Sequence, residues 1–249
     1  MECAFCGSGG KEHKEHVFPT WLRKFLALDK PRIVLLRSDG LKRQYSSSRD
    51  LGVKTGGICR ACNNGWMSAL ENQVEPLLSP FILGAWPTLN IEQRATLTRW
   101  ALKTAAAIDL MNGEHFFTQF DRQRLRALER LDDMVIVAWQ ARLLAAYAAS
   151  SVDYRIYYSS KDGAAMPGYV STLTLGHNVL QTLVLRPHRP NFRIPLNDNS
   201  RFDGAVAQLW PSIGNHDAPK HTLTEKGHGE LIDRFKAIGQ EADGRVARL

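Results

Sequence analysis

The sequence predicts an α+β protein in two parts: a compact, cysteine-bearing unit over residues 1–80, and a mixed α+β domain with a mainly antiparallel sheet over residues 81–249. Three observations lead to this prediction. All four cysteines lie in the first 62 residues, helical and strand-like segments follow one another without a regular βαβ repeat, and 249 residues suffice to bury a core without disulfides. No apolar run reaches the roughly 18 residues of a membrane-spanning helix, so no membrane association is expected.

The first part is expected to hold two helices separated by a short strand. Apolar residues recur at helical spacing over residues 18–28, and Ile33–Leu36 is an apolar run of strand length. The serine-rich stretch from Gln44 to Asp50 is expected to form a loop. A second helix is expected over residues 66–78, strained or ended near Pro76 because proline removes a backbone donor.

The second part is expected to combine three helices with about five strands. Asn90, with Gln93 three residues later, is typical of a capping box at the start of a long helix. Runs rich in β-branched and aromatic residues predict the strands. The expected helices cover residues 91–111, 120–131 and 225–238, and the expected strands cover residues 134–139, 154–158, 169–175, 179–185 and 205–210.

Positive charge is concentrated in one stretch of the chain. Residues 21–60 carry ten basic and three acidic side chains, so this segment alone accounts for the net charge of +7. Such a block suits either a surface that binds a polyanion or a solvated face that keeps the protein soluble, and charge alone does not separate the two. The candidate nucleic-acid-binding residues are Arg23, Lys24, Lys42, Arg43, Arg49, Lys54 and Arg60.

The four cysteines form two C-x-x-C pairs, Cys3 with Cys6 and Cys59 with Cys62. A two-residue gap lets one turn aim both thiolates at a single ion, and two such turns supply the four ligands of a structural Zn²⁺. A redox-active pair or coincidental core cysteines are the alternatives, and the absence of a βαβ pattern disfavours the first. Zinc held by four thiolates has no open position, so catalysis has to come from other residues.

Three motifs follow one another in the first 66 residues: CAFC at 3–6, EHVFP at 15–19 and CRACNNGW at 59–66. In this order they resemble the HNH, or ββα-metal, endonuclease superfamily, in its branch with two C-x-x-C pairs. The resemblance covers about residues 1–75. It implies an N-terminal, zinc-stapled ββα-metal domain and an enzyme that hydrolyses DNA phosphodiester bonds with the help of a divalent metal ion.

The resemblance implies roles for three residues. His16 corresponds to the general base, and a neutral imidazole with a pKa near about 6.5 can take a proton from water at pH 7. Glu15 and Asn63 correspond to the ligands of the catalytic metal, and their oxygen atoms suit Mg²⁺ or Mn²⁺. The family's middle asparagine has no counterpart among residues 52–58, where Thr55 or a backbone carbonyl is expected to take its place.

Several alternatives remain open at this point. Glu12–His13 is a second acid–histidine pair, disfavoured because Val-Phe-Pro follows only Glu15–His16. DNA is the expected partner, with RNA as an alternative, a homodimer as an open question, and the cytoplasm as the expected location because no apolar signal segment opens the sequence. A zinc-stapled nucleic-acid-binding module without catalysis is the main competing function. A weaker one assigns function to the region after residue 80.

Overall fold

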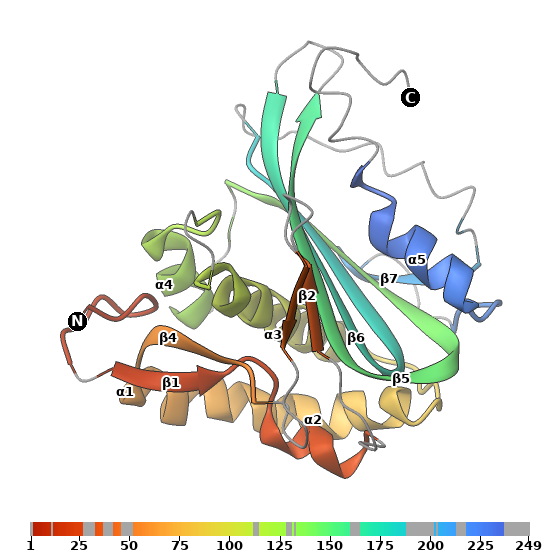
Figure 1. Ribbon diagram of the computed structural model, residues 1–249, viewed down its shortest axis with the longest axis horizontal. Helices are drawn as coiled ribbons and strands as arrows, with labels where there is room; N and C mark the ends of the chain where they lie inside the picture. Colours follow the sequence, from red (N-terminus) through yellow and green to blue (C-terminus); the bar gives the residue numbers. More distant parts are fainter. Residues whose placement is uncertain are drawn as a thin grey trace.

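The computed structural model describes residues 2–10, 12–26, 33–36, 42–45, 52–111, 115–127, 131, 133–159, 165–187, 202, 204–212 and 218–236. These residues form a two-stranded antiparallel sheet, a mainly antiparallel five-stranded sheet and helices that pack around them (Figure 1). The predicted α+β class is confirmed. No helix in the described part of the chain is long and apolar enough to cross a membrane.

The small sheet lies in the N-terminal part and leads directly into helical structure. Strand β1 (Glu12–His16) pairs antiparallel with β4 (Lys54–Cys59). The chain continues from β4 through the short helix α1 (Arg60–Cys62) and a π-helical segment, η2 (Asn63–Met67), into helix α2 (Ser68–Ile82). Two antiparallel strands are thus followed immediately by a helix.

The large sheet is built on two long strands, β5 (Val135–Ser159) and β6 (Ala165–Leu185), which pair antiparallel. The other edge of β5 carries β2 (Ile33–Leu36) in parallel and β7 (Val206–Trp210) in antiparallel orientation. Strand β3 (Lys42–Tyr45) pairs with β2, so two strands from the first 80 residues extend the sheet formed by the later part of the chain.

The four strands predicted between residues 134 and 185 are in fact two continuous strands. The sequence Gly176-His177-Asn178 resembles a turn, and the alanine-rich stretch after Arg142 has low strand propensity, so local patterns predict a break in each strand. The β5–β6 ladder instead runs through both places, with register shifts around Tyr147, which lies opposite Gly176. Gly176 has φ +58°, which lets the strand bend at the irregularity without ending.

Three predicted helices are present. Helix α3 (Ile91–Asp109) begins with the predicted capping box, in which the Asn90 side chain accepts from the Gln93 N–H at 2.9 Å and the Gln93 side chain accepts from the Asn90 N–H at 2.9 Å. Helices α4 (Gln119–Ala127) and α5 (Glu225–Asp233) match the second and third predictions. The ends predicted at residues 128–130 and 237–238 lie outside the described residues.

Three local predictions in the first part need correction. The helix predicted from residue 18 is a short 3-10 helix, η1 (Thr20–Lys24), held by bonds such as the one from the Leu22 N–H to the Pro19 carbonyl. The loop predicted from residue 44 starts later, because Gln44 and Tyr45 pair with β2; the rest of that loop lies outside the described residues. Helix α2 continues through Pro76 because its buried apolar residues pack on the core.

The main hydrophobic core lies around α3, which is buried on nearly all sides over residues 97–109. Figure 1 shows α3 and α5 on opposite sides of the β5–β6 pair. One core cluster contains Phe18 and Leu22 from the first part together with Trp100 and Leu180 from the second. The division at residue 80 stays a prediction, and the two predicted parts share this core.

Candidate functional site

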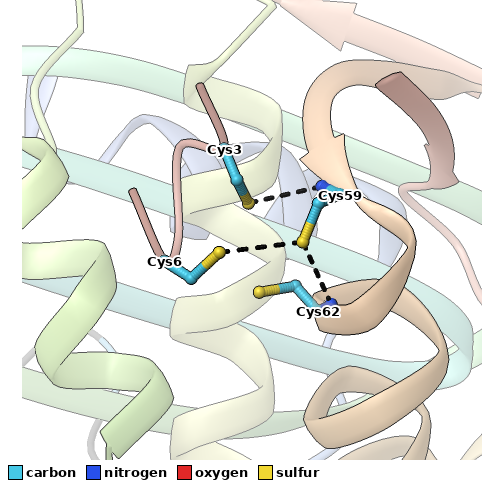
Figure 2. Close-up of side chains that lie close together, drawn as sticks. All are labelled: Cys3, Cys6, Cys59 and Cys62. Carbon is cyan, nitrogen blue, oxygen red and sulfur yellow. Dashed lines mark hydrogen bonds between the residues drawn. The ribbon is translucent and has the colours of Figure 1, made fainter. Parts of the chain in front are cut away.

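The four cysteine side chains converge between the N-terminal loop and the start of α1 (Figure 2). All four sulfur atoms lie within 4.8 Å of one another, and the Cys6 and Cys59 sulfurs are 3.7 Å apart. Tetrahedral zinc with Zn–S bonds of about 2.3 Å separates its sulfurs by about 3.8 Å. The predicted cluster is therefore present, and its four thiols could hold a structural zinc ion.

Backbone groups hold the cluster in shape. The Cys59 N–H donates to the Cys3 sulfur at 3.3 Å, and the Cys62 N–H donates to the Cys59 sulfur at 3.4 Å (Figure 2). In the first turn the Gly7 N–H donates to the Cys3 carbonyl at 2.8 Å. Gly7 has φ +74°, a conformation that favours glycine at the end of such a turn. N–H donors aimed at sulfur stabilise the thiolate form that binds metal.

The thiols differ in how readily they ionise. Burial raises the pKa of Cys6, but hydrogen bonds from the Ser8 side chain and backbone outweigh it and lower the pKa to about 6. Burial raises the pKa of Cys3 and of Cys62 above the ordinary range. Cys6 is thus the thiol most ready to receive a metal, and Cys3 and Cys62 release protons when one binds.

The small sheet positions the predicted Glu15–His16 pair. In the ladder Glu15 lies opposite Thr55, and His16 lies opposite Lys54. A bulge separates this stretch from the pairing nearer the cysteines, and Gly57, at φ +80°, lies on the bulged side. Glu15 is buried, with 4% of its surface exposed, whereas His16 is half-buried at the last position of β1.

Two further charged side chains meet Glu15 inside the protein. The Lys103 ammonium of α3 lies 3.8 Å from the Glu15 carboxylate and 2.8 Å from the Glu71 carboxylate of α2. Lys103 is fully buried. Burial raises the pKa of Glu15 to about 7, although the Lys103 charge opposes the rise. A buried carboxylate with one nearby cation is the kind of group that a divalent ion would stabilise.

Asn63 lies at the junction between the cysteine cluster and the helices. It directly follows the buried Cys62, is half-buried, and begins η2. Its convergence with Glu15 and His16 on one divalent metal stays a prediction. The competing Glu12–His13 pair also belongs to β1, but its side chains lie outside the described residues, so that alternative stays open.

Thr55 is positioned beside Glu15 rather than beside His16. Its side chain is buried, and its hydroxyl donates to the Gly56 carbonyl at 3.3 Å. The role expected for Thr55, or for a backbone carbonyl in its place, is to orient the histidine. That role stays a prediction.

The predicted basic residues fall into two groups. Four are exposed: Arg23, Lys24, Lys54 and Arg60. Lys24 pairs with Glu75 of α2 at 2.8 Å, so part of its charge is already balanced. The side chains of Lys42 and Arg43 in β3, and all of Arg49, lie outside the described residues.

Sequence reasoning missed Glu71 and Lys103. Lys103 lies away from the apolar stripe of Trp100 and Ala101, so the helical pattern indicates a solvated position for it. The pattern misleads because α3 is covered on both sides. Glu71 in the segment SALENQ likewise resembles an ordinary surface glutamate. Only the approach of α3 to α2 and β1 brings these two side chains to Glu15.

No protein-family model matches this chain, and no curated protein or solved structure matches it either. The functional conclusion consequently depends on the motifs and on the geometry described above.

Proposed function

We propose that this protein is a metal-dependent endonuclease of the HNH type that hydrolyses phosphodiester bonds in DNA. One observation carries the proposal. Strand β1, which bears Glu15 and His16, runs antiparallel to β4, and β4 leads through the cysteine cluster and Asn63 into α2. Two antiparallel strands followed by a helix are what the name ββα-metal describes. The arrangement therefore supports the resemblance that the motifs indicate.

The proposed chemistry uses one base and two metal ligands. His16 accepts a proton from a water molecule, whose oxygen attacks phosphorus while the bond from phosphorus to the 3′ oxygen breaks. The products carry a 5′-phosphate and a 3′-hydroxyl. Glu15 and Asn63 would hold Mg²⁺ or Mn²⁺, which supplies positive charge to the phosphate and to the leaving oxygen when bound. The zinc cluster is a scaffold and takes no part in the reaction.

The exposed basic residues give the proposed substrate a surface to contact. Lys54 lies opposite His16 in the ladder, and Arg60 directly follows Cys59. Both are exposed, as is Arg23 on η1. Cationic side chains around the proposed base suit contacts with phosphates on either side of the scissile bond.

The proposal is tested with supercoiled plasmid and zinc-loaded full-length protein in Mg²⁺, Mn²⁺ or EDTA. We expect nicked or linear plasmid with either metal and intact plasmid in EDTA. A kinase should label the product ends only after phosphatase treatment, because the 5′ ends carry phosphate. Intact plasmid under all conditions, or 5′-hydroxyl ends, would contradict the proposal.

A zinc-stapled nucleic-acid-binding module without catalysis is the second candidate. It is favoured by the lack of an asparagine among residues 52–58 and by the Thr55 hydroxyl, which donates to the adjacent Gly56 carbonyl. This candidate predicts a shifted plasmid band at low salt without cleavage in any divalent metal. Retarded but intact plasmid would therefore select it over the endonuclease.

A further inference from the structure

Lys103 joins the region after residue 80 to the proposed metal site. It lies near the middle of α3, its side chain is fully buried, and its ammonium group is enclosed with carboxylates from two other elements. Glu71 comes from α2 and Glu15 from β1. A buried ammonium needs such partners, because an unpaired charge in the interior is costly.

The two carboxylates do not share the ammonium equally. The Lys103 nitrogen lies 2.8 Å from Glu71, a hydrogen-bonding distance, and 3.8 Å from Glu15, which is too long for one. Glu71 thus takes the hydrogen bond. Glu15 is close enough to feel the positive charge, but the lysine does not occupy its carboxylate oxygen through a hydrogen bond.

We propose that Glu71 holds the Lys103 ammonium back from Glu15, so that Glu15 keeps an oxygen for a divalent cation. Lys103 and Glu71 are positioning residues in this arrangement, and neither touches the substrate. The inference rests on the proposed function in one respect, since it takes Glu15 to be a metal ligand. It also means that α3, outside the motif-bearing segment, sets how tightly the site binds its cation.

Opposite effects of two substitutions follow from this arrangement. Without the Glu71 charge, the buried Lys103 ammonium has Glu15 as its remaining carboxylate, so it should move closer and compete with the metal ion. Without the Lys103 charge, Glu15 loses its internal cation and should bind the metal ion more tightly. A merely structural role predicts the same direction for both, because each substitution would simply loosen the site.

The test measures Mn²⁺ binding to zinc-loaded full-length protein by isothermal titration calorimetry, with plasmid cleavage measured in parallel. Glu71→Gln should weaken Mn²⁺ binding at least about tenfold, Lys103→Met should strengthen it, and the double variant should bind more tightly than Glu71→Gln alone. Glu75→Gln is the matched control, since Glu75 lies one turn along α2 and pairs with the exposed Lys24 at the same 2.8 Å. Zinc content and melting temperature show whether each variant is folded.

The outcomes separate this inference from the nuclease proposal. Equal effects of Glu71→Gln and Glu75→Gln would overturn the inference even if Lys103→Met failed to fold. Weaker binding in both single variants would also overturn it, as would Mn²⁺ binding that is absent or insensitive to Glu15→Gln. Opposite shifts without plasmid cleavage by any variant would support the inference and contradict the nuclease. Cleavage by the wild type without these shifts would do the reverse.

Discussion

Cys59 contacts both halves of the thiol cluster. Its backbone N–H donates to the Cys3 sulfur, its own sulfur accepts from the Cys62 N–H, and that sulfur lies 3.7 Å from Cys6. It also ends β4, the strand that pairs with the one bearing Glu15. A change at this single atom should therefore affect metal binding and the small sheet together.

Replacing Cys59 by serine should remove zinc. The hydroxyl is a poor ligand compared with a thiolate, so zinc content should fall from about one ion per chain to near zero. The melting temperature should fall by about 10 °C or more, because binding of a structural metal contributes to the free energy of folding. Elemental analysis and a thermal melt measure the two effects. The exposed Ala61→Ser in the same turn is the control and should change neither. Full zinc content in Cys59→Ser would contradict the structural zinc site.

At this scale the sequence was informative where spacing is local. Two C-x-x-C pairs predicted the thiol cluster because a turn of two residues fixes where both sulfurs point. Lys103 and Glu71 carried no such signal, since their meeting depends on how α3 packs against α2 and β1. Spacing along a chain does not encode that approach.

At the scale of helices and strands, end signals were more informative than the lengths of strands. The capping box at Asn90 marked the start of α3 correctly, because the hydrogen bonds that define it join residues three apart. The lengths of β5 and β6 were wrong, because each strand is continued by its partner rather than by its own propensity. The bend at Gly176 shows the same limit: a glycine that resembles a turn lies within a continuous strand.

The long ladder also encloses an acidic group whose titration should be measurable. Asp153 on β5 is buried; burial raises its pKa to about 6, although a hydrogen bond from the Ser151 hydroxyl opposes the rise. A carboxyl with a raised pKa stabilises the folded state below its unfolded pKa, 3.8, and that stability is lost as the pH rises through about 6. The free energy of unfolding, relative to Asp153→Asn, should therefore fall by about 3 kcal/mol across this window.

Urea unfolding between pH 4 and pH 7 measures this difference. The exposed Asp233→Asn on α5 controls for the general loss of a negative charge, and its difference from the wild type should vary much less over the same range. A constant difference between the wild type and Asp153→Asn would contradict the buried, protonated carboxyl.

At the scale of the whole molecule, the chain shares one core across the predicted boundary at residue 80. Val17, Phe18 and Leu22 belong to the same cluster as Trp100 of α3 and Leu180 of β6. Strands β2 and β3 extend the large sheet, and Lys103 reaches Glu15 in the small one. The composition shift that suggested two domains, with all cysteines in the first part, reflects where metal ligands are needed rather than where the core divides.

Unfolding should accordingly occur in one transition. Differential scanning calorimetry of the zinc-loaded chain should give a single peak, with the calorimetric enthalpy equal to the van't Hoff enthalpy, because the shared core couples the two parts. Two separate peaks, or a calorimetric enthalpy well above the van't Hoff value, would instead support independent domains at 1–80 and 81–249.

The most direct measurement compares plasmid cleavage by the wild type, His16→Ala and His221→Ala in Mg²⁺ or Mn²⁺. His221 is exposed and lies outside the motifs, so His221→Ala controls for the loss of an imidazole. Loss of the general base should lower the cleavage rate at least about 100-fold in His16→Ala, with unchanged zinc content, whereas His221→Ala should cleave at the wild-type rate. Wild-type cleavage by His16→Ala would contradict the assignment of the base, and absence of cleavage by every form would contradict the nuclease itself.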